Sequence, residues 1–252
     1  MRYVLLLSGG VNHKYNYSRY ACDLAYAKQV LEERWGTVET VFDVIYADGR
    51  PIEYLGNKVI TKAASLDNVR FRLSEWKEEI QPEDELYVIV SNHGGVYNEM
   101  GIVNLWGKEY LSLAELVDLT NQISGYKYLI LGQCYAGNVL DLQMHNTLVL
   151  TANEADKESY ARIYKEIIAD GNDQYKYQYD EFLYHLISGL HGSYPSGKGL
   201  NGGRGKCQDI EEAYEYARAN DIWNPEHPDY QALCERIGRY DISEIPQLRY
   251  FA

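Results

Sequence analysis

Short runs of apolar residues alternate along the chain with longer stretches in which apolar residues recur at helical spacing. The short runs have the length and composition of buried strands. They are Tyr3–Leu7, Val41–Tyr46, Glu85–Val90, Tyr128–Leu131 and Thr147–Leu150. Strands that are apolar throughout and are separated by helices are typical of a parallel sheet covered on both faces. The pattern therefore predicts an α/β fold with a mainly parallel central sheet.

The helical stretches place apolar residues three or four positions apart, and several begin at a residue that can cap a helix. Val69, Leu73 and Trp76 follow this spacing, and Ser112 stands three residues before Glu115 in a capping-box pattern. The predicted helices are Ser18–Glu33, Ser65–Ile80, Ser112–Ile123, Ser159–Ala169, Tyr179–Leu190 and Asp209–Ala219.

A chain of 252 residues suits one large domain, and we find no internal repeat that would divide it. The glycine-rich stretch 192–205 is predicted to be the most flexible part of the chain, and a predicted helix follows it. We therefore expect a single domain over residues 1–252, with a flexible loop at 192–205 and a helical C-terminal segment at 207–252.

Composition and charge exclude several classes of function. The net charge of −13 argues against nucleic acid or an anionic membrane as the main partner, because both would repel the protein. The four cysteines lie far apart, which favours reduced thiols over a disulfide framework. The opening apolar run is too short for a signal segment, so we expect a cytoplasmic protein, either monomeric or dimeric.

Two reactive residues stand directly after predicted strands. His93 follows the strand Glu85–Val90 and is itself followed by Gly94, whereas Cys134 follows the strand Tyr128–Leu131. If these strands are neighbours, the imidazole and the thiol face the same crevice at the carboxyl edge of the sheet. A thiol near an imidazole can become the thiolate nucleophile of a cysteine enzyme, and glycine lets backbone N–H groups approach a substrate carbonyl.

Less specific interpretations stay open at this point. A single cysteine at a strand end is often only a small buried apolar residue, and a single histidine in a loop is often a surface residue. The other histidines have no cysteine or carboxylate at the spacing of a zinc site, so no metal is predicted. The segment Ser8-Gly9-Gly10 lacks the later glycine of a dinucleotide site and the lysine of a phosphate loop.

The sequence around these residues resembles the legumain-like (C13-type) cysteine peptidases, which are relatives of the caspases. The similar blocks, in the order found in that family, are Tyr15–Asp23, Ser91–Gly94, Gly132–Gly137, Thr151–Ala161 and, more weakly, Tyr179–Tyr184. The resemblance implies a three-layer α/β/α caspase-like fold. It also implies a cysteine endopeptidase that acts on protein or peptide substrates without a cofactor.

The resemblance assigns roles to individual residues. It implies that Cys134 attacks the scissile carbonyl and that His93 protonates the leaving amine. Asn16 matches the position whose side chain orients the histidine, and the backbone amides of Gly94 and Cys134 match the oxyanion hole. The implied chemistry passes through a thioester acyl-enzyme.

The residues that match the substrate-binding pocket depart from the family pattern. They are Ser18, Arg19, Gly132, Glu158 and Asp180. Ser18 stands where the family has arginine, with Arg19 beside it, and Gly132 replaces an acidic residue. Two carboxylates facing one arginine make a net-acidic pocket, so we expect cleavage after Lys or Arg, with Asn as the other candidate.

Two other functions compete with hydrolysis. A transpeptidase or ligase would use the same thioester, and a catalytically silent caspase-like scaffold would bind partners through its acidic, tyrosine-rich surface. Activation by a cut in a loop is a further expectation. Its candidate segments are Gly192–Gly205 and Asp170–Lys176.

Overall fold

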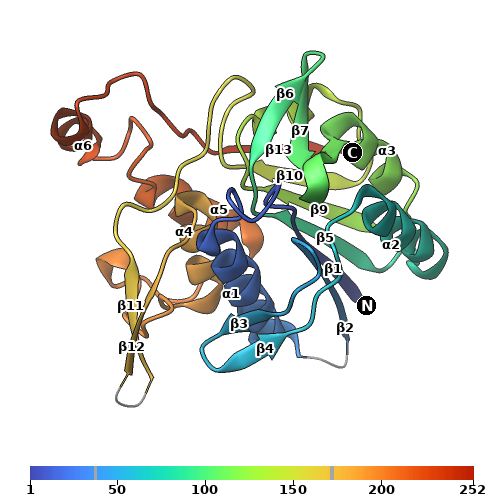
Figure 1. Ribbon diagram of the computed structural model, residues 1–252, viewed down its shortest axis with the longest axis horizontal. Coiled ribbons are helices and arrows are strands. Elements are labelled where there is room, and N and C mark those ends of the chain that lie inside the picture. The colour runs from blue at the N-terminus through green and yellow to red at the C-terminus, as the bar shows by residue number, and fades with distance from the viewer. Residues whose placement is uncertain (37–38, 171–172) are drawn as a thin grey trace.

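The five apolar runs form neighbouring parallel strands at the centre of the protein (Figure 1). The computed structural model describes residues 1–36, 39–170 and 173–252. Its main sheet has the strand order β13-β10-β9-β5-β1-β2. The bounds are β1 (Arg2–Ser8), β2 (Thr40–Tyr46), β5 (Glu85–Val90), β9 (Tyr126–Leu131), β10 (Thr147–Thr151) and β13 (Gln247–Phe251). The prediction of a mainly parallel sheet is confirmed.

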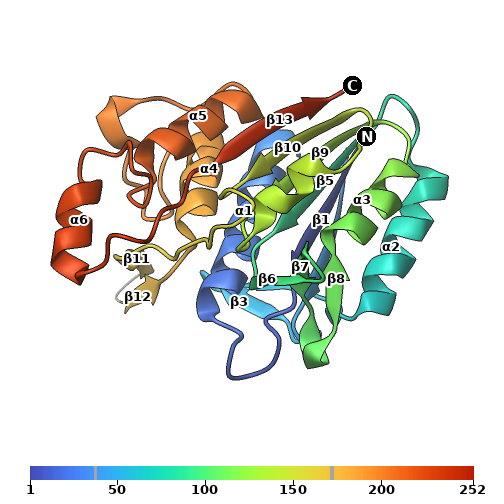
Figure 2. The same ribbon diagram turned by 90° about the horizontal axis from the view of Figure 1, so that it is seen from above.

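Helices cover both faces of this sheet, and Figure 2 shows the three layers from above. One face carries α1 (Ser18–Trp35), α4 (Glu181–His191) and α5 (Ile210–Asn220), and the other carries α2 (Leu66–Glu79) and α3 (Leu113–Asn121). Alternate residues of a strand point to opposite faces of the sheet. Leu6 packs on the face covered by α1, α4 and α5, and Leu5 and Leu7 pack on the face covered by α2 and α3.

The predicted caps form as expected. The Ser112 side chain accepts from the Glu115 N–H at 3.0 Å at the start of α3. The Asp209 side chain accepts from the Glu212 N–H at 2.8 Å at the start of α5. Each bond satisfies a backbone donor that the helix itself leaves without a partner, so these helices begin where the sequence indicates.

The predicted helix Ser159–Ala169 is wrong. This segment crosses the carboxyl edge of the sheet, where Ala161 forms a β-bridge with Asp180 and the Arg162 N–H donates to the Tyr179 carbonyl at 2.9 Å. It then enters the strand β11 (Glu166–Asp170). Pairing with a distant part of the chain has overridden the local pattern, which contains isoleucines that also favour strand.

Short strands lie outside the main sheet. The strands are β3 (Ile52–Tyr54), β4 (Asn57–Val59), β6 (Gly94–Tyr97), β7 (Met100–Asn104), β8 (Tyr110–Ser112), β11 (Glu166–Asp170) and β12 (Asp173–Tyr177). The sequence pattern missed them because each has only three to five residues.

The C-terminal segment 207–252 is helical only in part. It contains α5 and α6 (Tyr230–Ile237) but ends as β13, which pairs antiparallel with β10 at the edge of the sheet. The loop 192–205 is anchored at Tyr194, whose hydroxyl lies 2.5 Å from that of Tyr216 in the core. Of the candidate cut segment Asp170–Lys176, residues 171 and 172 lie outside the described residues.

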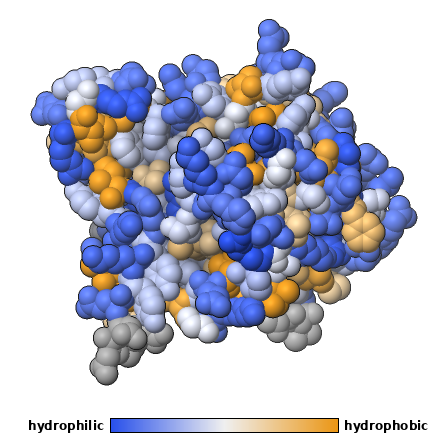
Figure 3. All heavy atoms as spheres, viewed as in Figure 1, coloured by the Kyte–Doolittle hydropathy of each residue, from blue (hydrophilic) through white to orange (hydrophobic). Residues whose placement is uncertain are grey.

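Polar side chains dominate the face seen in Figure 3, and apolar residues are scattered among them. Across residues 1–36, 39–170 and 173–252, no helix combines the length and apolar character needed to cross a membrane. In the same residues, no group of three or more His, Cys, Asp or Glu side chains is placed to hold a metal ion.

Candidate active site

The register of β5 and β9 brings the two reactive residues together. These strands are parallel neighbours, and their last residues, Val90 and Leu131, are paired. His93 and Cys134 are each the third residue beyond this pair, so the two loops leave the sheet side by side. The sequence could not show that the strands are neighbours, but it did show that both residues follow strand ends.

Gly94 fits against the loop of the cysteine so closely that no side chain can replace its hydrogen. A Cβ atom at Gly94 would lie 2.0 Å from the carbonyl oxygen of Cys134 and 2.9 Å from Cγ of Gln133. A carbon atom and an oxygen atom that are not bonded cannot approach this closely unless the backbone shifts. The absent side chain therefore lets the histidine loop and the cysteine loop touch.

Two buried asparagines brace these loops, and sequence reasoning missed both. The Asn153 side chain donates to the Gln133 carbonyl at 3.1 Å and accepts from the Ala136 N–H at 3.0 Å, so it holds both sides of Cys134. The Asn92 side chain accepts from the Gly10 N–H at 2.9 Å. Buried amide groups with satisfied donors and acceptors fix a loop in one conformation.

The imidazole of His93 is oriented by a backbone group. Its Nε2 lies 3.0 Å from the carbonyl oxygen of Tyr15. The Asn16 side chain, expected to orient the histidine, instead donates to the Tyr46 hydroxyl at 2.8 Å. The expectation for the Asn16 side chain is therefore corrected. The residue before it, Tyr15, orients the histidine, because the chain that leads into α1 turns the Tyr15 backbone carbonyl toward the ring.

Aromatic rings surround the half-buried imidazole. Its centroid lies 5.0 Å from the ring of Tyr17 and 5.3 Å from that of Tyr20, with tilted, edge-type geometry. Burial and the nearby Arg19 guanidinium lower the pKa of His93, and the bond to the Tyr15 carbonyl opposes them. The imidazole is therefore neutral near pH 7.

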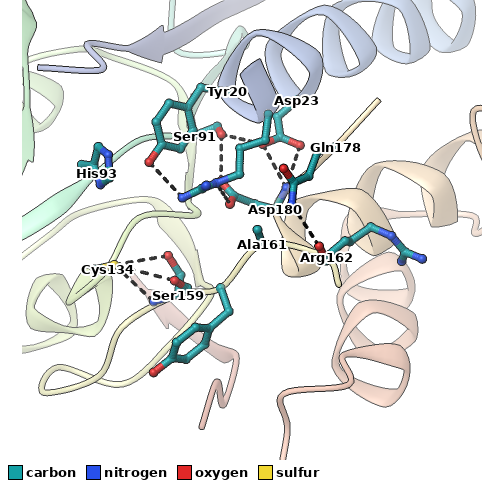
Figure 4. A network of polar contacts seen from close by, with 12 residues as sticks. Tyr20, Asp23, Ser91, His93, Cys134, Ser159, Ala161, Arg162, Gln178 and Asp180 are labelled. Carbon is teal, nitrogen blue, oxygen red and sulfur yellow. Dashed lines mark hydrogen bonds and ion pairs between the residues drawn. The ribbon is translucent and has the colours of Figure 1, made fainter. Parts of the chain in front are cut away.

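The thiol of Cys134 contacts the segment that follows β10. Its Sγ accepts from the Ser159 N–H at 3.4 Å and lies 3.7 Å from the Ser159 hydroxyl (Figure 4). Burial raises the pKa of the Cys134 thiol, the charges of Glu158 and Asp180 add to this, and the Ser159 contacts lower it. Within the described residues, no hydrogen bond joins Cys134 to His93.

Ser159→Ala is expected to raise the thiol pKa further, because the substitution removes a donor that favours the thiolate. Alkylation of Cys134 by iodoacetamide, followed by peptide mass analysis across pH, should shift to higher pH by about half a unit. Ser196→Ala is the control, since Ser196 lies in the loop 192–205 and its hydroxyl contacts Glu166 of β11. Equal alkylation profiles for both variants would contradict a role for the Ser159 hydroxyl.

Residues near the C-terminus hold the segment that contacts the thiol. The Tyr160 N–H donates to the buried Glu244 carboxylate at 2.5 Å, and the Trp223 indole N–H donates to the Ala161 carbonyl at 3.1 Å. Ser159 lies in the block Thr151–Ala161, which resembles the peptidase family, so the sequence offered some indication that this residue belongs to the site. Glu244 and Trp223 lie outside every such block, and nothing in the sequence pointed to them.

Arg19 and Asp180 form an ion pair beside the thiol and the imidazole. The Arg19 Nε donates to an Asp180 oxygen at 2.8 Å, and an Nη donates to the Tyr20 hydroxyl at 3.1 Å. The guanidinium also stacks on the rings of Tyr17 and Tyr20, at 4.5 and 4.7 Å. Its other Nη has no hydrogen-bond partner in the described part of the chain, which leaves it free to bind an acceptor.

The other expected pocket residues are placed differently. Glu158 is exposed, and its charge acts on the Cys134 thiol. Ser18 is exposed on the first turn of α1. Gly132 is buried, and a Cβ there would lie 2.6 Å from a methyl carbon of Leu183. Gly132 therefore does not line a pocket, and an acidic side chain at this position would collide with α4.

Comparisons with solved structures agree with the fold described above. The crystal structure of the Drosophila initiator caspase Dronc superimposes with a TM-score of 0.54 at 7% identity, over 99% of this chain and 79% of the caspase. Caspase-1 from Spodoptera frugiperda gives a TM-score of 0.50 at 11% identity, over 100% of this chain and 86% of the caspase. At such identities the likeness shows a caspase-like fold alone.

The sequence comparisons are more specific about the family. No curated protein sequence matches the chain. The model of the peptidase C13 family matches residues 45–196, a span that includes His93, Cys134, Glu158 and Asp180 but begins after Arg19. Because this span is more than half of the chain, the protein belongs to the peptidase C13 family and is a cysteine-type peptidase with a caspase-like fold.

Proposed function

We propose that this peptidase cuts peptide bonds within proteins or peptides, with Cys134 as nucleophile and His93 as the proton-transfer group. The observation that carries the proposal is that each residue is the third beyond the paired ends of two neighbouring parallel strands, β5 and β9. The contact between Gly94 and the Cys134 backbone supports an oxyanion hole made of their two amides.

The reaction then proceeds through a thioester. Nδ1 of the neutral His93 takes the thiol proton as the Cys134 sulfur bonds to the substrate carbonyl carbon, and the C–N bond then breaks as the leaving amine takes that proton from His93. Water adds to the thioester and restores the thiol and the new carboxyl group. The Nε2 atom of His93 faces the Tyr15 carbonyl, which can only accept, so Nε2 carries a hydrogen and Nδ1 is the atom that exchanges protons.

Neutral resting groups fit this sequence of steps. Burial raises the pKa of Cys134, whereas burial and Arg19 lower that of His93, so the thiol and the imidazole both begin uncharged. The thiol proton leaves only when a substrate is bound. The Ser159 N–H and hydroxyl then stabilise the developing charge on sulfur.

The ion pair changes the expected preference at the residue before the cut. Asp180 is buried, and its two oxygens are taken up by Arg19 and by Ser91, so it is not free to bind a substrate cation. Arg19 offers an N–H to an acceptor, and Glu158 is an exposed carboxylate whose charge acts on the Cys134 thiol. We therefore place Asn, whose carboxamide both accepts and donates, ahead of Lys and Arg.

A panel of fluorogenic peptides that differ only in this residue tests the proposal. We expect Asn peptides to be cleaved about tenfold faster than Lys or Arg peptides, because a hydrogen-bonding pocket discriminates strongly against side chains that leave its groups unpaired. Glu158→Gln should reduce cleavage after Lys and Arg and leave the Asn peptide unchanged. Cleavage confined to Asp peptides would contradict both the Asn and the basic preference.

An electrophilic peptide probe checks the nucleophile independently of this preference. It should label Cys134 in the native protein and fail to do so after His93→Ala or after unfolding. Cys207 and Cys234, both buried, serve as internal controls. If Cys134 in the native protein is labelled no faster than Cys207 and Cys234 are in the unfolded protein, then His93 does not activate Cys134.

A further inference from the structure

A second carboxyl group lies buried behind the Arg19–Asp180 pair. Asp23 is one helical turn after Arg19 on α1, and its side chain meets Ser91, which follows β5, and Asp180, which directly precedes α4 (Figure 4). Asp23 is only 4% exposed, Asp180 3%, and Ser91 not at all. Asp23 lies outside the family match, which begins at residue 45, and the expected pocket includes neither Asp23 nor Ser91.

The Ser91 hydroxyl reveals how the protons are arranged. Its oxygen lies 2.6 Å from a carboxyl oxygen of Asp23 and 3.0 Å from one of Asp180. A hydroxyl has one hydrogen and can donate to only one of them. The other contact is favourable only if that carboxyl group carries a proton and donates it to the Ser91 oxygen.

Asp23 is the member that carries the proton. Burial raises the pKa of Asp180, but the Arg19 charge and the bond from Arg19 Nε at 2.8 Å oppose this shift and stabilise the anion. No cationic side chain bonds Asp23 within the described residues; besides Ser91, its oxygens meet the backbone N–H of Asp180 at 3.2 Å. The protons therefore run in one direction, from Asp23 to Ser91, from Ser91 to Asp180, and from Arg19 to Asp180.

The surrounding charges agree with this assignment. Burial, and after it the neighbouring Asp180 charge, raise the pKa of Asp23 well above its usual range. The other titratable groups that face it are Cys22 on α1 and Tyr179 before α4; burial raises the pKa of each, so both are neutral. Arg19 is thus the single cation of the group, and two ionised carboxylates would leave it with an uncompensated negative charge.

We propose that Asp23 is a specificity-determining positioning residue. While Asp23 holds its proton, the floor of the substrate pocket has zero net charge. When Asp23 releases this proton, the pocket binds a cationic side chain. The inference rests on the proposed function, since it concerns the pocket beside Cys134. With the proton in place, Arg19 and Asp180 balance each other and favour an uncharged carboxamide. Without it, one unmatched negative charge favours Lys or Arg.

The test is the ratio of kcat/KM for a Lys peptide to kcat/KM for the matching Asn peptide, measured across pH. Ionisation of Cys134 and His93 affects both peptides equally and cancels in the ratio. We expect the ratio to rise by about tenfold between pH 5.5 and pH 8.5 in the wild type, because one added charge acts on the substrate cation at short range. A ratio independent of pH in the wild type would overturn the proposal.

Two variants of Asp23 distinguish the effect of its ionisation from the effect of its size and hydrogen bond. Asp23→Asn imitates a protonated carboxyl group that can still donate to Ser91, so it should keep cleaving Asn peptides and should show a flat ratio at all pH values. Asp23→Ala removes the donor and should lower kcat/KM for Asn peptides by about tenfold. A ratio that still rises with pH in Asp23→Asn would overturn the assignment.

Thermal unfolding in a Cys134→Ala background tests the proton without any activity. Because the folded-state pKa of Asp23 is raised, its contribution to stability is fully present below the unfolded pKa, about 4, and is lost as pH rises toward the folded pKa. Asp23→Asn lacks this loss, so its Tm should gain on that of the background protein as pH increases. Parallel Tm curves would overturn the proposal even if the wild type cleaves Asn peptides. If no peptide is cleaved, the proposed function fails while the Tm curves still decide whether Asp23 holds the proton.

Discussion

Cys134→Ala is expected to lower kcat/KM for the best peptide substrate by about 10⁴-fold or more, because no other atom at this site can form the acyl-enzyme. The methyl group fits where the thiol lies, so the fold should be retained. Residual turnover would come only from the oxyanion donors and substrate binding. The measurement is hydrolysis at enzyme concentrations high enough to detect such residual turnover, together with Tm.

Cys207→Ala and Cys234→Ala are the matched controls for this substitution. Both thiols are buried, Cys207 just before α5 and Cys234 within α6, and neither belongs to the loops that follow β5 and β9. Each replacement should cost about 1 kcal/mol of stability or slightly more through the small cavity it leaves. Below their Tm, both should hydrolyse the substrate like the wild type. Unchanged hydrolysis by Cys134→Ala, or an equal loss in either control, would remove Cys134 from the mechanism.

The sequence predicted the parts of the site that depend on strand ends. The strand Glu85–Val90 was predicted with the bounds that β5 has, and the end of β9 was placed at Leu131 as observed. Since parallel neighbours end at the same edge, His93 and Cys134 had to meet once β5 and β9 were paired. The apolar composition of a buried strand carries this information, and the α/β/α layers follow from it.

The parts that were missed depend on backbone groups and on contacts between distant segments. A carbonyl oxygen orients His93, and any residue at position 15 would supply one, so no side-chain signal exists for it. Likewise, nothing local shows that Asp180 is consumed by Arg19 and Ser91 and is unavailable to a basic substrate. Residue types indicated a charged pocket, but only the packing of α1 against α4 shows how those charges cancel.

Gly94→Ala is expected to damage both the fold and the chemistry. Its Cβ would lie 2.0 Å from the Cys134 carbonyl oxygen, so the two loops must separate by about 1 Å or more to restore van der Waals contact. Overpacking of this kind costs about 1 to 3 kcal/mol of stability. A shift of that size at reacting groups, with the amide of Gly94 displaced from the oxyanion, should lower kcat by about 10²-fold or more.

Gly95→Ala is the control, because it adds the same methyl group one residue further along β6. There the Cβ would meet the Ile102 side chain at 3.5 Å, an ordinary contact, and the residue has no positive φ that an alanine would strain. We expect kcat within about threefold of the wild type and a stability change within about 0.5 kcal/mol. If Gly95→Ala lost as much activity as Gly94→Ala, the effect would belong to the hairpin as a whole. A fully active Gly94→Ala would show that the loops can part without harm, and the contact between Gly94 and Cys134 would then not build the oxyanion hole.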